Sequence, residues 1–95
     1  MSNADKPIVL IVDDNIANIE VLGAALASDY EIRFATGGAE GLELARRVPP
    51  DLILLDVMMP GMDGFETCQR LRANPQMRDT PVIFISALDA VADKV

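Results

Sequence analysis

Three aspartates stand directly after two short apolar segments. Asp13 and Asp14 follow residues 8–12, and Asp56 follows residues 52–55. Short continuous apolar runs with β-branched residues are typical of strands buried on both faces of a parallel sheet. Ligands of such sheets bind beyond the carboxyl ends of the strands, so neighbouring strands would bring these carboxylates to one edge. Crowded carboxylates repel one another and stay ionised only around a cation. Hard oxygen ligands favour Mg²⁺, with Mn²⁺ as an alternative.

The rest of the sequence alternates predicted strands and helices. Strands are predicted over residues 7–12, 30–34, 51–57 and 81–86, and helices over residues 15–27, 39–47 and 65–73. Apolar side chains recur at helical spacing in the first helix, at Ile16, Ile19, Leu22 and Leu26. Asn15 is its predicted N-cap. This alternation predicts an α/β fold with a doubly wound parallel sheet, in a single domain that covers residues 1–95.

Four segments of the chain resemble the receiver domain of two-component response regulators, in that family's order and spacing. They are residues 11–15 (IVDDN), 51–56 (DLILLD), 59–64 (MPGMDG) and 81–87 (PVIFISA). The resemblance implies a flavodoxin-like fold with strand order 2-1-3-4. It also implies a signalling switch that takes a phosphoryl group from a sensor histidine kinase or a phosphotransfer protein. Such a domain assists its own phosphorylation and dephosphorylation and is not otherwise an enzyme.

The resemblance assigns the acidic residues their roles. Asp56 would be the phosphoacceptor, and Mg²⁺ would be held by Asp13, Asp14, Asp56 and the backbone carbonyl of Met58. From the residues alone, Asp56 could instead be a turn or N-cap aspartate. The Asp13–Asp14 pair could likewise complement the dipole at a helix N-terminus.

Two further roles follow from the resemblance. Ser86 would donate its hydroxyl to a phosphoryl oxygen as a switch residue, and Ala87 would leave space for the phosphoryl group and offer its backbone N–H. From spacing alone, Ser86 could equally cap the next helix. The family also has a lysine at the end of a fifth strand, followed by a fifth helix, and the 95 residues include neither element. Lys94 is predicted to lie in the fourth helix and not to replace that lysine. We therefore expect slower phosphoryl transfer and weaker coupling to Ser86.

The same comparison predicts an assembly. Without a fifth strand, the outer edge of the fourth strand and the apolar side chains of residues 82–85 would be uncovered. Uncovered edges and apolar patches are association sites. We therefore expect a two-fold homodimer joined around the fourth strand, through a strongly apolar interface.

Composition restricts the partners. The net charge of −7 argues against direct binding of nucleic acid and of anionic membranes. Residues 1–6 lack the basic segment and apolar region of a signal peptide, and residues 8–12 are too few to span a bilayer, so we expect a cytoplasmic protein. Cys68 is the single cysteine and is predicted to lie on the buried face of a helix.

Three other functions fit parts of the sequence. A receiver that cannot switch would act as a protein-interaction or dimerisation module. A phosphatase with an aspartyl nucleophile is a second alternative, but such enzymes usually carry another Asp two residues later, where this chain has Met58. A flavin-binding protein is the third. It is disfavoured because acidic strand ends repel phosphate and no Gly-rich cradle precedes the first helix.

Overall fold

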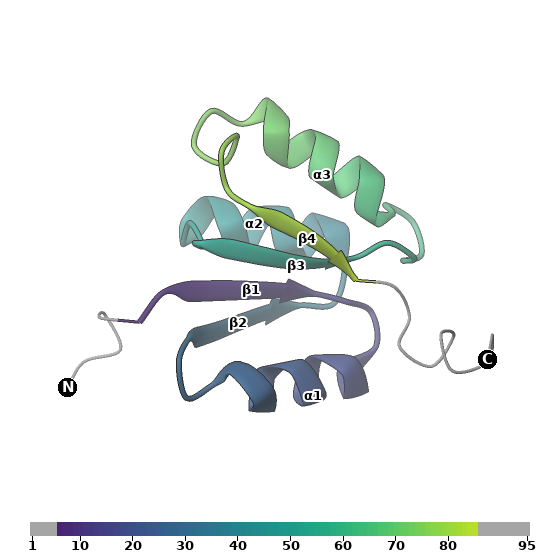
Figure 1. The fold of residues 1–95 in the computed structure, drawn as a ribbon. Coiled ribbons are helices and arrows are strands. Elements are labelled where there is room, and N and C mark those ends of the chain that lie inside the picture. The colour runs from purple at the N-terminus through teal and green to yellow at the C-terminus, as the bar shows by residue number, and fades with distance from the viewer. Residues whose placement is uncertain (1–5, 86–95) are drawn as a thin grey trace.

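The computed structural model describes residues 6–85, which form a four-stranded parallel sheet with three helices (Figure 1). The strands are β1 (Ile8–Val12), β2 (Glu31–Ala35), β3 (Leu52–Asp56) and β4 (Val82–Ile85). The helices are α1 (Ile16–Leu26), α2 (Gly38–Arg47) and α3 (Gly64–Ala73). Each element begins and ends within one residue of its predicted range.

The strands lie in the order β2-β1-β3-β4, which confirms the predicted topology. Figure 1 shows α1 on one face of the sheet and α2 and α3 on the other. Successive side chains of β1 therefore enter different cores. Val9 and Ile11 pack with Ile19 of α1. Leu10 and Val12 instead pack in a cluster with residues of α2 and α3. Burial on both faces explains why β1 and β3 read as continuous apolar runs.

Helix α1 begins as predicted, but one of its apolar residues, Ile16, is exposed. The side chain of Asn15 accepts hydrogen bonds from the backbone N–H groups of Ala17 and Asn18, which confirms it as the N-cap. Ile19 is buried, whereas Ile16 is 52% exposed. Ile16 occupies the first position of the helix, next to the exposed Asp14 and Asn15, so helical spacing alone does not bury it.

Two other sequence predictions concern half-buried positions. In the edge strand β2, apolar and polar residues alternate from Tyr30 to Phe34, which predicts a half-exposed strand, and residues 31–33 are partly buried. Phe34 departs from this pattern, because it is exposed although its apolar character groups it with Ile32. Cys68 is partly buried and packs against the core beneath α2 and α3. That placement fits the predicted structural thiol.

Candidate functional site

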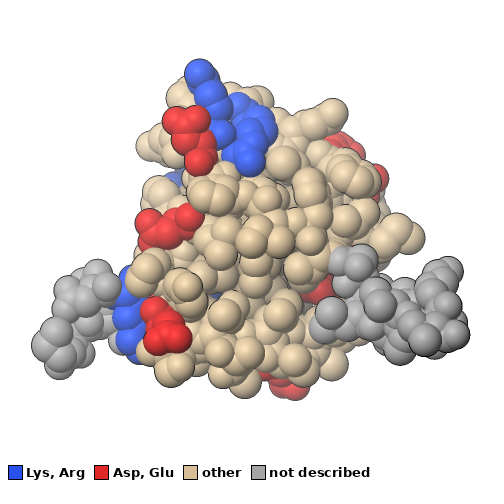
Figure 2. Space-filling view, viewed as in Figure 1, with Lys and Arg blue, Asp and Glu red and all other residues tan. Residues whose placement is uncertain are grey.

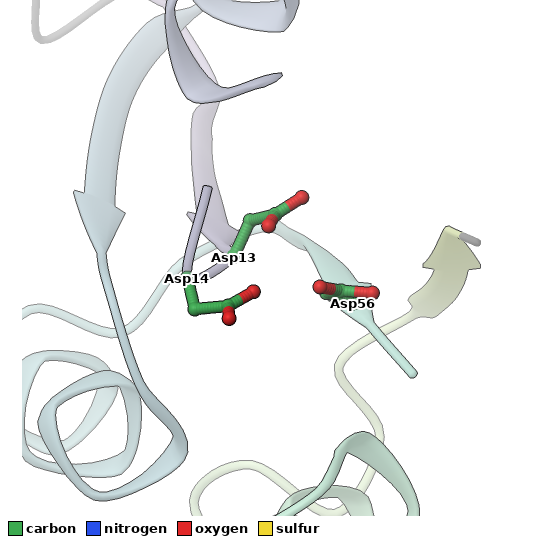
Figure 3. A group of neighbouring side chains, drawn as sticks. All are labelled: Asp13, Asp14 and Asp56. Atoms are coloured by element: carbon green, nitrogen blue, oxygen red, sulfur yellow. The ribbon is translucent and has the colours of Figure 1, made fainter. Parts of the chain in front are cut away.

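The strand register brings the predicted acidic residues together. Val12 of β1 lies opposite Leu55 of β3, so both strands end at the same edge of the sheet. Asp13, Asp14 and Asp56 each offer one carboxylate oxygen, and these oxygens lie within 4.8 Å of one another (Figure 3). Asp13 and Asp56 are buried, at 2% and 4% exposure, whereas Asp14 is exposed. The cluster is therefore open to solvent on the side of Asp14.

Hydrogen bonds hold both buried carboxylates. One oxygen of Asp13 accepts from the backbone N–H of Asn15 at 2.9 Å, and the other accepts from the side-chain amide of Asn18 at 3.3 Å. One oxygen of Asp56 accepts from the backbone N–H of Met58 at 3.1 Å. These donor groups belong to the start of α1 and to the turn after β3. In the described residues no lysine or arginine forms an ion pair with any of the three aspartates.

The loop between β3 and α3 is anchored at both ends. Met59 is buried in the core, whereas Met58 is 71% exposed. Gly61 has a φ of 76°, a conformation that favours glycine. Asp63 caps α3 by accepting from the N–H of Glu66 at 2.9 Å. The loop therefore has a fixed path that leaves Met58 at the surface beside Asp56.

Burial changes the acidity of Asp56. It raises the pKa of the Asp56 carboxyl from 3.8 to about 6, chiefly because the ionised form loses its hydration. The N–H of Met58 lowers the pKa, and the neighbouring Asp13 and Asp14 raise it further. A carboxyl that is costly to ionise is a weak nucleophile until positive charge comes close.

The donor set fits a small divalent cation. Three carboxylates from two adjacent strand ends supply hard oxygen ligands, and the open side leaves room for waters and a further oxygen ligand. No sulfur or imidazole group belongs to the cluster, which argues against a soft metal. Asp13, Asp14 and Asp56 are therefore suited to Mg²⁺. The predicted contribution of the Met58 carbonyl stays a prediction.

A family comparison covers the acidic residues and all of the described sheet except Ile8. A family model described as the response regulator receiver domain matches residues 9–95. The chain belongs to this family. This membership selects the receiver over the phosphatase and the flavin-binding protein among the alternatives that the sequence left open.

Relatives of this receiver domain are much longer proteins. The chain is 48% identical over 88 residues to the response regulator PleD of Caulobacter vibrioides, covering 92% of this chain and 19% of PleD. It is 39% identical over 80 residues to the signal transduction histidine-protein kinase BarA of Escherichia coli, covering 83% of this chain and 9% of BarA. The chain thus spans a small part of each relative.

Solved structures of other proteins share the fold of this chain. The chemotaxis protein CheY4 of Vibrio cholerae superposes with a TM-score of 0.81 at 30% identity, over 93% of this chain and 77% of that one. The N-terminal domain of a response regulator receiver protein from Methanoculleus marisnigri gives 0.79 at 40% identity, over 82% and 64%. The fold is that of a receiver domain.

Some predicted features of the receiver domain are not placed by the structure. Ser86, Ala87 and Lys94 lie outside the described residues. Every helix within residues 6–85 is too short or too polar to cross a bilayer.

Sequence reasoning missed one contact of the site, the hydrogen bond from the Asn18 side chain to Asp13. The signal available was the position of Asn18, one helical turn after the N-cap Asn15, which can aim its amide back toward the end of β1.

Proposed function

We propose that this receiver domain is a phosphoacceptor switch that takes a phosphoryl group onto Asp56. The observation that carries the proposal is the convergence of Asp13, Asp14 and Asp56 at the adjoining ends of β1 and β3. The domain is proposed to act in the cytoplasm, with a histidine kinase or phosphotransfer protein as its donor. The histidine kinase BarA contains a segment similar to this chain, which supports that class of partner.

The protein's own groups supply the positioning. The N–H of Met58 holds one oxygen of Asp56, which leaves the other oxygen to attack phosphorus. The new O–P bond forms as the N–P bond of the donor phosphohistidine breaks, and the imidazole nitrogen leaves with the bonding electron pair. Such transfer depends mainly on alignment and charge neutralisation. Asp13, Asp14 and the Met58 carbonyl would hold Mg²⁺ together with Asp56. The bound ion would screen the negative charge between acceptor and donor.

Two roles are proposed for residues beyond β4. The Ser86 hydroxyl would donate to a phosphoryl oxygen, and the backbone N–H of Ala87 would donate beside it. Asp56 pairs with Ile85 in the sheet register, so the chain leaves β4 next to the acceptor. That register supports a switch role for Ser86.

The labelling of Asp56 tests the proposed function. With acetyl phosphate and Mg²⁺, wild type should acquire acid-labile phosphate, and Asp56→Asn should stay at background, because an amide cannot form the acyl phosphate. Asp51→Asn is the matched control. Asp51 stands at the opposite end of β3, where it accepts from the N–H of Ile8 at 2.7 Å, and this variant should label like wild type. Equal labelling of wild type and Asp56→Asn would refute the assignment.

A second candidate function, a dimerisation module, is supported by the surface of β4. This strand pairs with β3 on one side, and its side chains Ile83 and Phe84 are 52% and 40% exposed. The ring of Phe84 lies 5.1 Å from that of Phe65, itself 58% exposed. Phe84 points toward α3 and Ile83 toward the opposite face of the sheet, so together they make the outer edge of β4 apolar. Figure 2 shows few charged side chains in the middle of the view, where Figure 1 places β4. We propose that, in the 95-residue chain, a second copy of the chain covers the outer edge of β4. We also propose that the domain does not bind nucleic acid directly.

Sedimentation of the 95-residue chain at micromolar concentration tests this assembly. Wild type should sediment as a dimer, and Ile83→Glu as a monomer, because a buried unpaired charge opposes association. Val21→Glu is the matched control, since Val21 is 61% exposed on α1, away from β4, and this variant should remain dimeric. A folded wild-type monomer would show that the apolar edge of β4 needs no second copy.

A further inference from the structure

The buried carboxylate of Asp13 receives a donor on each of its oxygens. The backbone N–H of Asn15 bonds to one oxygen at 2.9 Å, and the side-chain amide of Asn18 bonds to the other at 3.3 Å. Asp13 is only 2% exposed, so protein donors must replace most of its hydration. Two donors on different oxygens fix both the position and the plane of this carboxylate.

Asn18 differs from the other donors to the acidic cluster. Among the described residues it is the only side chain that donates a hydrogen bond to Asp13, Asp14 or Asp56. The other donors are backbone groups, which are present whatever the sequence. The contact at Asn18 therefore depends on residue type, and substitution can remove it without changing the ligands.

The start of α1 sets the position of this amide. The N-cap Asn15 accepts from the N–H groups of Ala17 and Asn18, which fixes the first turn of the helix. Asn18 then lies partly buried on the turn that follows, facing the end of β1. A neutral amide suits this place, because a lysine or arginine would pair with Asp13 and oppose a cation at the same cluster.

We propose that Asn18 is a positioning residue, whose amide holds Asp13 in the orientation that the acidic cluster needs to bind a divalent cation. The inference rests on the proposed function, because it concerns the same metal site. Groups that orient metal ligands from behind typically change affinity by about 10-fold or more when they are removed. Asn18 acts through Asp13 and need not contact the cation or the phosphoryl group.

The test is the dissociation constant for Mg²⁺, measured by titration calorimetry or by NMR shifts on the 95-residue protein. Asn18→Leu keeps a similar volume without the donor and should bind Mg²⁺ about 10-fold more weakly than wild type. Asn18→Ala, which removes the amide with less risk of crowding, should show the same loss. A cooperative unfolding transition, measured in EDTA so that no metal is bound, checks that each variant is folded.

A control variant distinguishes a specific effect on the metal site from a general effect of replacing asparagine by leucine. Asn74→Leu makes the same substitution at the C-cap of α3, where the Asn74 side chain accepts from the N–H of Gln76, and it should leave the Mg²⁺ affinity unchanged. Folded Asn18 variants that bind Mg²⁺ within about twofold of wild type would overturn the inference alone. A wild type that binds no Mg²⁺, or an Asp14→Ala variant that binds equally well, would overturn the metal site itself and the inference with it.

Discussion

Without divalent metal at pH 7, Asp56→Asn is expected to raise the free energy of unfolding by about 3 kcal/mol. The pKa of Asp56 is raised from 3.8 to about 6 in the folded protein, first by burial. The folded state therefore holds this proton more tightly than the unfolded chain. The stability from this group is complete below pH 3.8 and is lost as the pH rises through 6. An asparagine does not ionise and escapes this loss.

Urea unfolding followed by circular dichroism from pH 4 to pH 8 checks the effect, because the chain has no tryptophan. The difference between Asp56→Asn and wild type should grow across that range, since only wild type becomes charged there. Asp51→Asn, at an exposed position, is the control and should follow wild type. Added Mg²⁺ should stabilise wild type more than Asp56→Asn. Parallel curves for wild type and Asp56→Asn would contradict the raised pKa.

Much of the fold could be predicted because its signals are local. The apolar runs 8–12 and 52–55 mark central strands, since both of their faces are buried. Asn15 marks a helix start because its side chain caps its own neighbours. Strand order is not a local property. It came from the family resemblance, and the register then confirmed that β1 and β3 are neighbours.

The candidate site was predictable to the level of its acidic residues, but not to the level of its contacts. The sequence places Asp13 and Asp56 at strand ends, and the strand order implied by the family resemblance makes those strands neighbours, which groups the two residues at one edge. The sequence cannot distinguish Met58 from Met59, although packing exposes the first and buries the second. Nor does it reveal that Asn18 reaches Asp13, because that bond depends on how α1 leaves the sheet. Such contacts are set by tertiary packing.

Gly64→Ala is expected to cost about 3 kcal/mol of stability and to disturb the acceptor site. A Cβ atom on Gly64 would lie 2.3 Å from the backbone oxygen of Asp56 and 2.9 Å from the Cα of Val57. Both neighbours are backbone, so neither can turn aside as a side chain would. Gly64 also donates from its N–H to the Val57 oxygen at 3.0 Å, which ties the start of α3 to the end of β3. Relief of the clash must move Asp56, Val57 or α3.

The matched control is Gly23→Ala, the same substitution inside α1. There the new Cβ would have ordinary contact with Ile32 at 3.7 Å, and alanine favours a helix interior over glycine by about 1 kcal/mol. Urea unfolding should therefore show opposite signs, with loss at Gly64 and gain at Gly23. Phosphate labelling should fall for Gly64→Ala alone, even under conditions where that variant is folded. A Gly64→Ala protein as stable and as readily labelled as wild type would mean that α3 and the end of β3 are not packed too closely for a Cβ atom. The close approach of α3 to Asp56 would then have no part in holding the site.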